Sequence, residues 1–162
     1  MINEQELSKL ALESKKHKNK VRDKKSEDRN IAEWQIFYLN NLDIFTEDFL
    51  EIPLHYFQKQ ILLQAWEADV DDVVASRGLS KSFTIANLAN DLALLLPGIQ
   101  IAVTAMTLGQ ANKILNDKIG ELLCGDKKGI SPVLKQMRKE GYIKFGKDDT
   151  GNGAVVTYGN GS

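Results

Sequence analysis

Hydrophobic residues recur at three- and four-residue spacings in residues 31–50, a pattern typical of helices that bury one face. Asn40–Asn41 interrupts the pattern and Pro53 ends it, so we expect a helix that is broken near its middle. The first role of its apolar positions is core packing, and these positions are Ile31, Trp34, Phe37, Tyr38, Leu42, Phe45, Phe49 and Leu50.

Three further helices are predicted by the same spacing. One runs from about His55 to Ala68, and a longer one runs from Phe83 to Leu96, where Pro97–Gly98 stops it. Thr107 and Gln110 have the spacing of a capping box and open another helix that continues to about Leu123.

Two short apolar runs have the character of buried strands. They are residues 73–75 and residues 101–106, and both are rich in β-branched side chains. Each run precedes a predicted helix, so strand, loop, helix, turn, strand and helix follow one another as in a βαβ unit with a right-handed crossover. This order predicts an α/β fold built on a parallel sheet.

The last third of the chain is less regular. Ser131–Pro132 begins a short helix that ends at Gly141, and residues 142–145 and 154–158 alternate like the two strands of a hairpin. Asn160–Gly161 is a strong signal for a two-residue hairpin turn, and the chain reaches Ser162 directly after it. We therefore expect this chain to be a truncated part of a longer protein.

Composition adds little about partners. The chain of 162 residues carries 21 Lys and Arg against 22 Asp and Glu, so its overall charge does not indicate nucleic acid. Residues 15–29 hold eight basic and three acidic side chains, a local net charge of +5. We interpret residues 1–30 as a charged, flexible arm, with contact to DNA or to a partner protein as the alternative.

Compartment is indicated by cysteine usage and by the lack of long apolar runs. Cys124 is the one cysteine, which excludes an internal disulfide and fits a reducing environment, and no Cys or His cluster beside it predicts a metal site. The sequence has neither an apolar run of 18 residues nor a signal peptide. We expect a soluble, cytoplasmic protein that does not interact with membranes.

A candidate phosphate-binding loop lies between the first predicted strand and the helix that starts near Phe83. Its sequence is Val73-Val74-Ala75-Ser76-Arg77-Gly78-Leu79-Ser80-Lys81-Ser82. In such loops backbone N–H groups cradle phosphates, a Lys reaches the β/γ oxygens and a hydroxyl holds Mg²⁺. The strict pattern G-x-x-x-x-G-K-[ST] has glycines where this chain has Ala75 and Ser80. A surface Lys-Ser at a helix start is the alternative interpretation.

Several motifs at set intervals resemble the N-terminal ATPase domain of the large terminase subunit, the motor that packages DNA into tailed-phage capsids. These motifs are Trp34-x-x-Phe37, Leu54-x-x-Phe57-Gln58, Ala75-Ser76-Arg77-Gly78-x-Ser80-Lys81-Ser82, Pro97-Gly98 with residues 101–107 and Gln110-Ala111, and Asn160-Gly161-Ser162. The resemblance runs from about Ile31 to Ser162. It implies a P-loop NTPase of the RecA-like (ASCE) class, a three-layer parallel-sheet domain that is incomplete here and is preceded by a helical region.

The resemblance also implies roles for single residues. The nucleotide would lie against Ser76, Arg77, Gly78, Leu79, Ser80, Lys81 and Ser82. Lys81 would contact the β/γ-phosphates, Ser82 would bind Mg²⁺, and Arg77 would sense or stabilise the γ-phosphate; its alternative is a surface arginine away from phosphate. Gln58 would recognise the adenine edge, with Gln60 as the alternate candidate. Gln110-Ala111 would match a coupling motif that faces nucleotide or DNA.

One part of the family pattern is missing. No apolar run ending in Asp-Glu follows Ser82, and Asp148-Asp149 lies in a polar stretch that does not replace it. The family implies ATP and Mg²⁺ as cofactors and double-stranded viral DNA, the portal protein and the small terminase subunit as partners. It also implies a homo-oligomeric ring that works in the host cytoplasm at the procapsid. A superfamily 2 helicase fragment and a non-catalytic, degenerate P-loop module are the alternatives.

Overall fold

The computed structural model describes residues 27–74, 76 and 78–162, and it divides the chain into two compact units, Met1–Phe37 and Tyr38–Ser162. Most of the predicted arm therefore lies outside the described residues. In the first unit, residues 27–37 are helical, and Arg29 pairs with Glu33 across one turn. Trp34 and Phe37 are 41% and 52% exposed rather than buried.

The second unit begins with an aromatic cluster. After the predicted break at Asn40–Asn41, which is confirmed, the chain forms α2 (Leu42–Ile44) and the π-helix η1 (Phe45–Phe49). The rings of Phe45 and Phe49 stack with centroids 5.1 Å apart, and Tyr38 meets Phe45 edge-on at 5.3 Å. Phe45 is buried, so the cluster anchors this end of the unit to the core.

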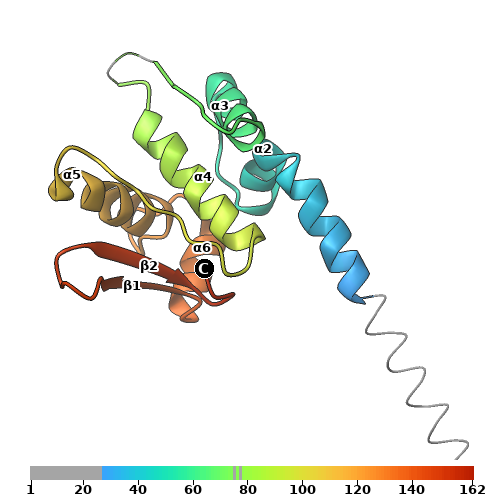
Figure 1. The fold of residues 1–162 in the computed structure, drawn as a ribbon. Helices are drawn as coiled ribbons and strands as arrows, with labels where there is room; N and C mark the ends of the chain where they lie inside the picture. Colours follow the sequence, from blue (N-terminus) through green and yellow to red (C-terminus); the bar gives the residue numbers. More distant parts are fainter. Residues whose placement is uncertain (1–26, 75, 77) are drawn as a thin grey trace, which may run out of the picture. The chain divides into compact units, whose positions relative to one another are not determined.

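Two longer helices follow as predicted, α3 (Tyr56–Glu67) and α4 (Lys81–Leu95). Figure 1 shows α4 in the middle of the unit, with α3 on one side and the α5 region on the other. The core gathers around α4, and its buried hydrophobic residues are Leu42, Phe45, Leu50, Ile52, Leu62, Ala86, Ala93, Leu95, Ile119, Leu123, Cys124, Leu134, Ile143 and Tyr158.

The predicted helix after Thr107 is present in two parts, α5 (Leu108–Lys113) and the π-helix η2 (Ile114–Leu123). The Thr107 hydroxyl accepts a hydrogen bond from the Gln110 N–H at 3.3 Å, which confirms the predicted cap. The π-helical geometry of the second part was not predicted. It gives η2 a wider turn than an α-helix has, and η2 packs along α4.

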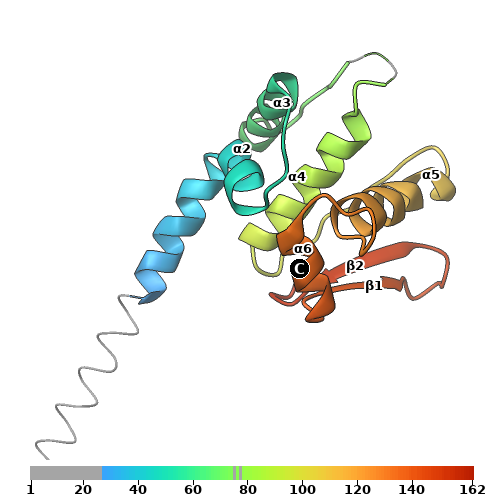
Figure 2. The ribbon, with the colours of Figure 1, turned by 180° about the vertical axis from the view of Figure 1, so that it is seen from behind.

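The C-terminal elements confirm the predictions made from local sequence signals. Ser131 caps α6 (Pro132–Lys139), and β1 (Ile143–Lys147) pairs antiparallel with β2 (Ala154–Tyr158). The Gly161 N–H donates to the Tyr158 carbonyl at 3.1 Å, which closes a turn around Gly159–Asn160, one residue before the predicted Asn160–Gly161 turn. Figure 2 shows α6 and the hairpin from behind.

The two segments predicted as parallel strands are not strands in the described residues. Val73, Val74 and residues 101–105 carry no regular structure, Ala75 lies outside the description, and the described sheet is the two-stranded hairpin. A strand forms only where a neighbour accepts and donates its backbone hydrogen bonds, and neither segment has one in this part of the chain. The parallel-sheet fold stays a prediction.

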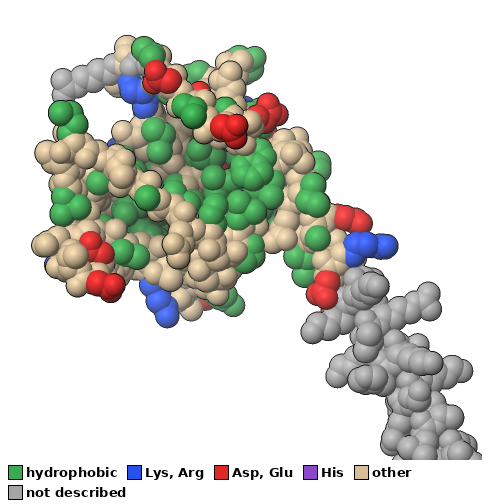
Figure 3. All heavy atoms as spheres, viewed as in Figure 1, with side chains coloured by type: hydrophobic (Ala, Val, Ile, Leu, Met, Phe, Trp, Pro, Cys, Tyr) green, Lys and Arg blue, Asp and Glu red, His purple; other side chains and the backbone are tan. Residues whose placement is uncertain are grey.

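The same segments leave apolar side chains in contact with solvent. Val74 is 90% exposed and Met106 is 97% exposed. Figure 3 shows hydrophobic side chains gathered across the middle of one face, with charged side chains mostly at its edges.

Candidate functional site

Two described residues of the loop before α4 have left-handed backbone angles, and one of them, Ser80, stands where the strict phosphate-loop pattern has its second glycine. Gly78 has φ +95°, and Ser80, the N-cap of α4, has φ 51° and ψ 26°. A Cβ added at Gly78 would meet no atom within 4 Å, so glycine is favoured there by its backbone angle and not by space. Ser80 holds the left-handed conformation at a cost of roughly 1–2 kcal/mol. Ser80 therefore adopts at this position a left-handed backbone conformation that glycine adopts without strain.

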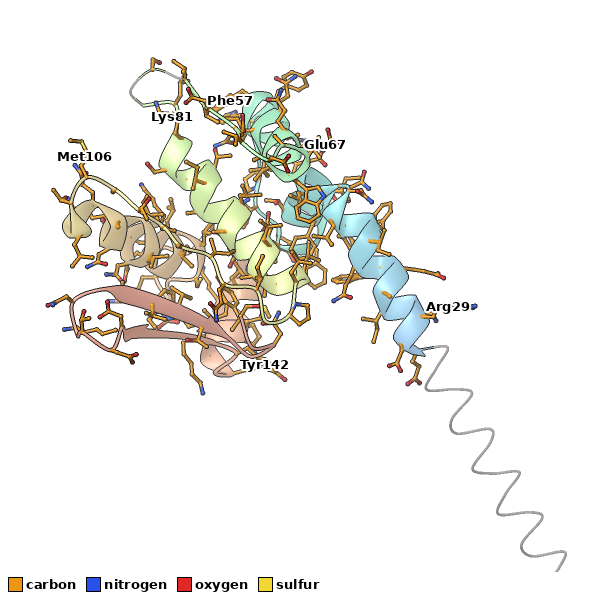
Figure 4. All side chains as sticks on the ribbon, in the orientation of Figure 1. Arg29, Phe57, Glu67, Lys81, Met106 and Tyr142 are labelled. Carbon is orange, nitrogen blue, oxygen red and sulfur yellow. The ribbon has the colours of Figure 1, made fainter. Side chains whose placement is uncertain are left out.

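Lys81 folds back over this loop. Its Nζ donates a hydrogen bond to the Ser76 carbonyl oxygen at 2.9 Å. Figure 4 shows Lys81 on the first turn of α4, beside the loop. Behind it, the Thr84 hydroxyl donates to the Ser80 carbonyl at 3.2 Å. Both residues lie in the first turn of α4, where Lys81 is half-buried and Ser82 is exposed.

A cavity of about 610 Å³ opens at this end of α4, within the size range of small-molecule sites. It is lined by Pro53, His55, Gln58, Gly78, Leu79, Ser80, Lys81, Ser82, Phe83, Lys118, Leu122 and Ile130. Six of the predicted nucleotide-binding residues thus meet around one space. Of the other two, Ser76 does not line the cavity, although its carbonyl accepts the hydrogen bond from Lys81. Arg77 lies outside the described residues.

The charge of the cavity wall is of one sign. Among the described lining residues there are two lysines, Lys81 and Lys118, and no Asp or Glu. The first N–H groups of α4 also end here, and a helix N-terminus carries partial positive charge. A wall of this composition favours an anionic ligand.

Gln58 has a structural role besides its place in the cavity. It is 3% exposed, and its Oε1 accepts a hydrogen bond from the His55 N–H at 2.8 Å, which caps α3. Capping occupies one acceptor position of the amide, and the side chain still lines the cavity. Gln60, the alternate candidate, donates to the Tyr56 hydroxyl at 3.2 Å and does not line it.

Other residues singled out in the sequence lie away from this cavity. Gln110 and Ala111 are in α5 and do not line it. Asp148 accepts a hydrogen bond from the Thr150 hydroxyl at 2.8 Å, which holds the pKa of the Asp148 carboxyl below its usual value, helped by backbone N–H groups of the same loop. Burial raises the pKa of the Cys124 thiol to about 12, so this thiol is unreactive.

A buried polar cluster on the middle of α4 was missed at the level of sequence. The Tyr158 hydroxyl donates to Asn90 Oδ1 at 2.9 Å, and Asn87 Nδ2 donates to Thr46 Oγ1 at 3.3 Å. Asp91 is fully buried, with its Oδ2 only 2.6 Å from Thr46 Oγ1. The cluster ties α4 to η1 and to β2. In the sequence these residues are polar positions between the apolar residues of the predicted helix, and no pattern marked them as buried.

Burial raises the pKa of Asp91 to about 8, although the Thr46 hydroxyl partly opposes the shift. Hydrogen-bond geometry agrees with a protonated Asp91. The Thr46 hydroxyl lies 2.8 Å from the Leu42 carbonyl as well as 2.6 Å from Asp91, and one proton cannot serve both acceptors. A neutral Asp91 donates to Thr46, which then donates to Leu42.

Comparisons of the chain with protein-family models, with curated proteins and with solved structures found no significant match. Within residues 27–74, 76 and 78–162, no helix combines the length and the apolar character needed to cross a membrane.

Proposed function

We propose that the cavity at the start of α4 binds ATP together with Mg²⁺, and that the chain is the N-terminal ATPase part of a viral DNA-packaging motor of the large-terminase type. One observation carries the nucleotide proposal. Six residues selected from sequence, from α3 and from the loop before α4, line a single cavity that contains two lysines and no described acid.

Different residues of the cavity are proposed to contact the phosphates and the base of the nucleotide. Lys81 supplies a point charge to the β/γ-phosphates, and the N–H groups at the start of α4 bind phosphate oxygens. Gln58 and His55 form the α3 wall, where the Gln58 amide can hydrogen-bond an adenine edge. Arg77, in the part of the loop that is not described, is proposed to act on the γ-phosphate.

One residue of the cavity wall, Ser82, is suited to bind Mg²⁺. Mg²⁺ takes six oxygen ligands and is commonly held by one or two protein groups, phosphates and water. The Ser82 hydroxyl lines the cavity and would supply one of the six, with phosphate and water oxygens as the others. When bound, the metal neutralises phosphate charge.

The DNA-packaging part of the proposal rests on the sequence resemblance alone. It assigns double-stranded viral DNA, the portal protein, the small terminase subunit and a homo-oligomeric ring as partners, in the cytoplasm of the host. It also assigns residues 73–75 and 101–106 to a parallel sheet of the P-loop class. The alternative, a fragment of a superfamily 2 DNA helicase, would use the same ATP site.

A second candidate is a module that binds nucleotide without hydrolysing it. The cavity wall favours this candidate in one respect, since no carboxylate among the described lining residues is placed to orient an attacking water. Phosphate release by the purified chain well above a Lys81→Ala sample would exclude this second candidate.

The test is a calorimetric titration of the purified chain with ATP and Mg²⁺. We expect saturable binding by the wild type and loss of measurable binding in Lys81→Ala, because the phosphates lose their main point charge. Lys113→Ala is the matched control, since Lys113 is an exposed lysine of α5 that does not line the cavity. Equal ATP affinity in the wild type and in Lys81→Ala would mean that the loop is not a phosphate site.

A further inference from the structure

Lys118 is a second lysine of the cavity, and no sequence motif selected it. It comes from η2, some 37 residues along the chain from Lys81, and it lines the cavity together with Leu122 of the same π-helix. Its side chain is half-buried, so it is not a fully solvated surface charge.

No acid neutralises Lys118 in the described residues. The ion pairs found there join Arg29 to Glu33 and Lys59 to Glu47, and no carboxylate lines the cavity. Two ammonium groups around one space repel each other, and the repulsion grows where water is partly excluded. An anion that contacts both lysines turns this repulsion into attraction.

The position of η2 shows which end of a nucleotide Lys118 would meet. Gln58 and His55 are on α3, whereas Lys118 is on η2, and Figures 1 and 2 both show α4 between α3 and the α5–η2 region. A nucleotide whose base lies at the α3 wall extends its phosphates past the start of α4. Its last phosphate then reaches the η2 wall.

We propose that Lys118 binds the terminal phosphate of a nucleoside triphosphate in this cavity and thereby makes the affinity for ATP higher than the affinity for ADP. The inference rests on the proposed function, because it places the base and the inner phosphates as described above. It adds a residue that discriminates triphosphate from diphosphate.

The experiment measures the affinities of the purified chain for ATP and for ADP by calorimetry, with Mg²⁺, in four proteins. Lys118→Gln should weaken ATP binding by about tenfold or more, because it removes a hydrogen bond to a charged group, and should leave ADP binding nearly unchanged. Lys118→Arg keeps the charge and should retain the preference for ATP. Lys113→Gln, the control, should match the wild type.

The outcomes separate this inference from the proposed function. Loss of ATP binding in Lys81→Ala with an unchanged ATP-to-ADP preference in Lys118→Gln overturns the inference and keeps the proposed function. If the wild type binds neither nucleotide, the proposed function fails, and titration with inorganic tripolyphosphate decides about Lys118. Weaker tripolyphosphate binding in Lys118→Gln supports a phosphate contact, whereas absent binding or equal affinity overturns it.

Discussion

Two regions of α4 show opposite ways of placing charge. Its N-terminal end borders a cavity with two lysines and no described acid, while its middle holds a fully buried acid, Asp91, among neutral polar groups. At the cavity, the two lysines are partly exposed to solvent and line a space where an anion can bind. In the core Asp91 is removed from solvent, and it avoids the cost of a buried charge by taking up a proton. Exposure therefore decides which charged groups of this helix can serve a ligand.

The largest expected effect is the pH dependence of stability that Asp91 imposes. Its pKa is about 8 in the folded chain and near 3.8 when unfolded, so between these values the folded state binds the additional proton. The contribution is fully present below about pH 4 and is lost as pH rises to about pH 8, by up to about 1.4 kcal/mol per pH unit. Urea unfolding at several pH values measures this dependence.

Asp91→Asn should remove that dependence and stabilise the chain at pH 8, because the amide keeps a donor for Thr46 and carries no charge. Asp117→Asn, at an exposed position of η2, is the control. If the wild type and Asp91→Asn lose stability equally between pH 5 and pH 8, then Asp91 is not protonated in the fold.

A smaller effect is expected from Tyr158→Phe in the same buried cluster. The substitution leaves Asn90 Oδ1 without its donor, and Asn90 Nδ2 already has no partner in the described structure. We expect a loss of about 1–3 kcal/mol in the free energy of unfolding, with unchanged ATP affinity. Tyr142→Phe, at a tyrosine that is 54% exposed, should have little effect on either quantity. A fall in ATP affinity in Tyr158→Phe would show that the two regions of α4 are coupled.

Ser80→Gly should give a smaller change of opposite sign. Glycine adopts the left-handed conformation at position 80 without strain, so we expect a gain of roughly 1 kcal/mol in thermal or urea unfolding, reduced by the greater freedom of glycine in the unfolded chain. Ser80→Ala keeps the strain and should show no gain. Destabilisation by Ser80→Gly alone would mean that the serine hydroxyl matters more than the backbone angle.

The smallest expected signal is ATP hydrolysis by the chain itself. Phosphoryl transfer depends on positioning and electrostatics, and the one acid of α4 is buried away from the cavity wall. We expect phosphate release at the level of a Lys81→Ala sample. Release well above that control would show that the chain supplies a group that orients water.

Local signals in the sequence determined much of this chain. The break at Asn40–Asn41, the helices α3 and α4 and the cap at Thr107 were all predicted correctly, because each depends on residues within one or two turns of each other. The candidate loop was also selected from sequence. Its Lys-Ser pair lies at the start of a helix, where local rules place it.

Tertiary structure alone decided which residues meet. Residues 73–75 and 101–106 have strand composition, but a strand needs a paired neighbour, which no local pattern supplies. Lys118 and Lys113 look alike in the sequence, and packing of η2 along α4 brings only Lys118 to the cavity. In the sequence Asp91 is a polar position of a predicted helix, and its burial in the tertiary structure makes it a neutral acid. Contacts between distant segments set solvation, and solvation sets whether a charge binds a ligand or takes up a proton.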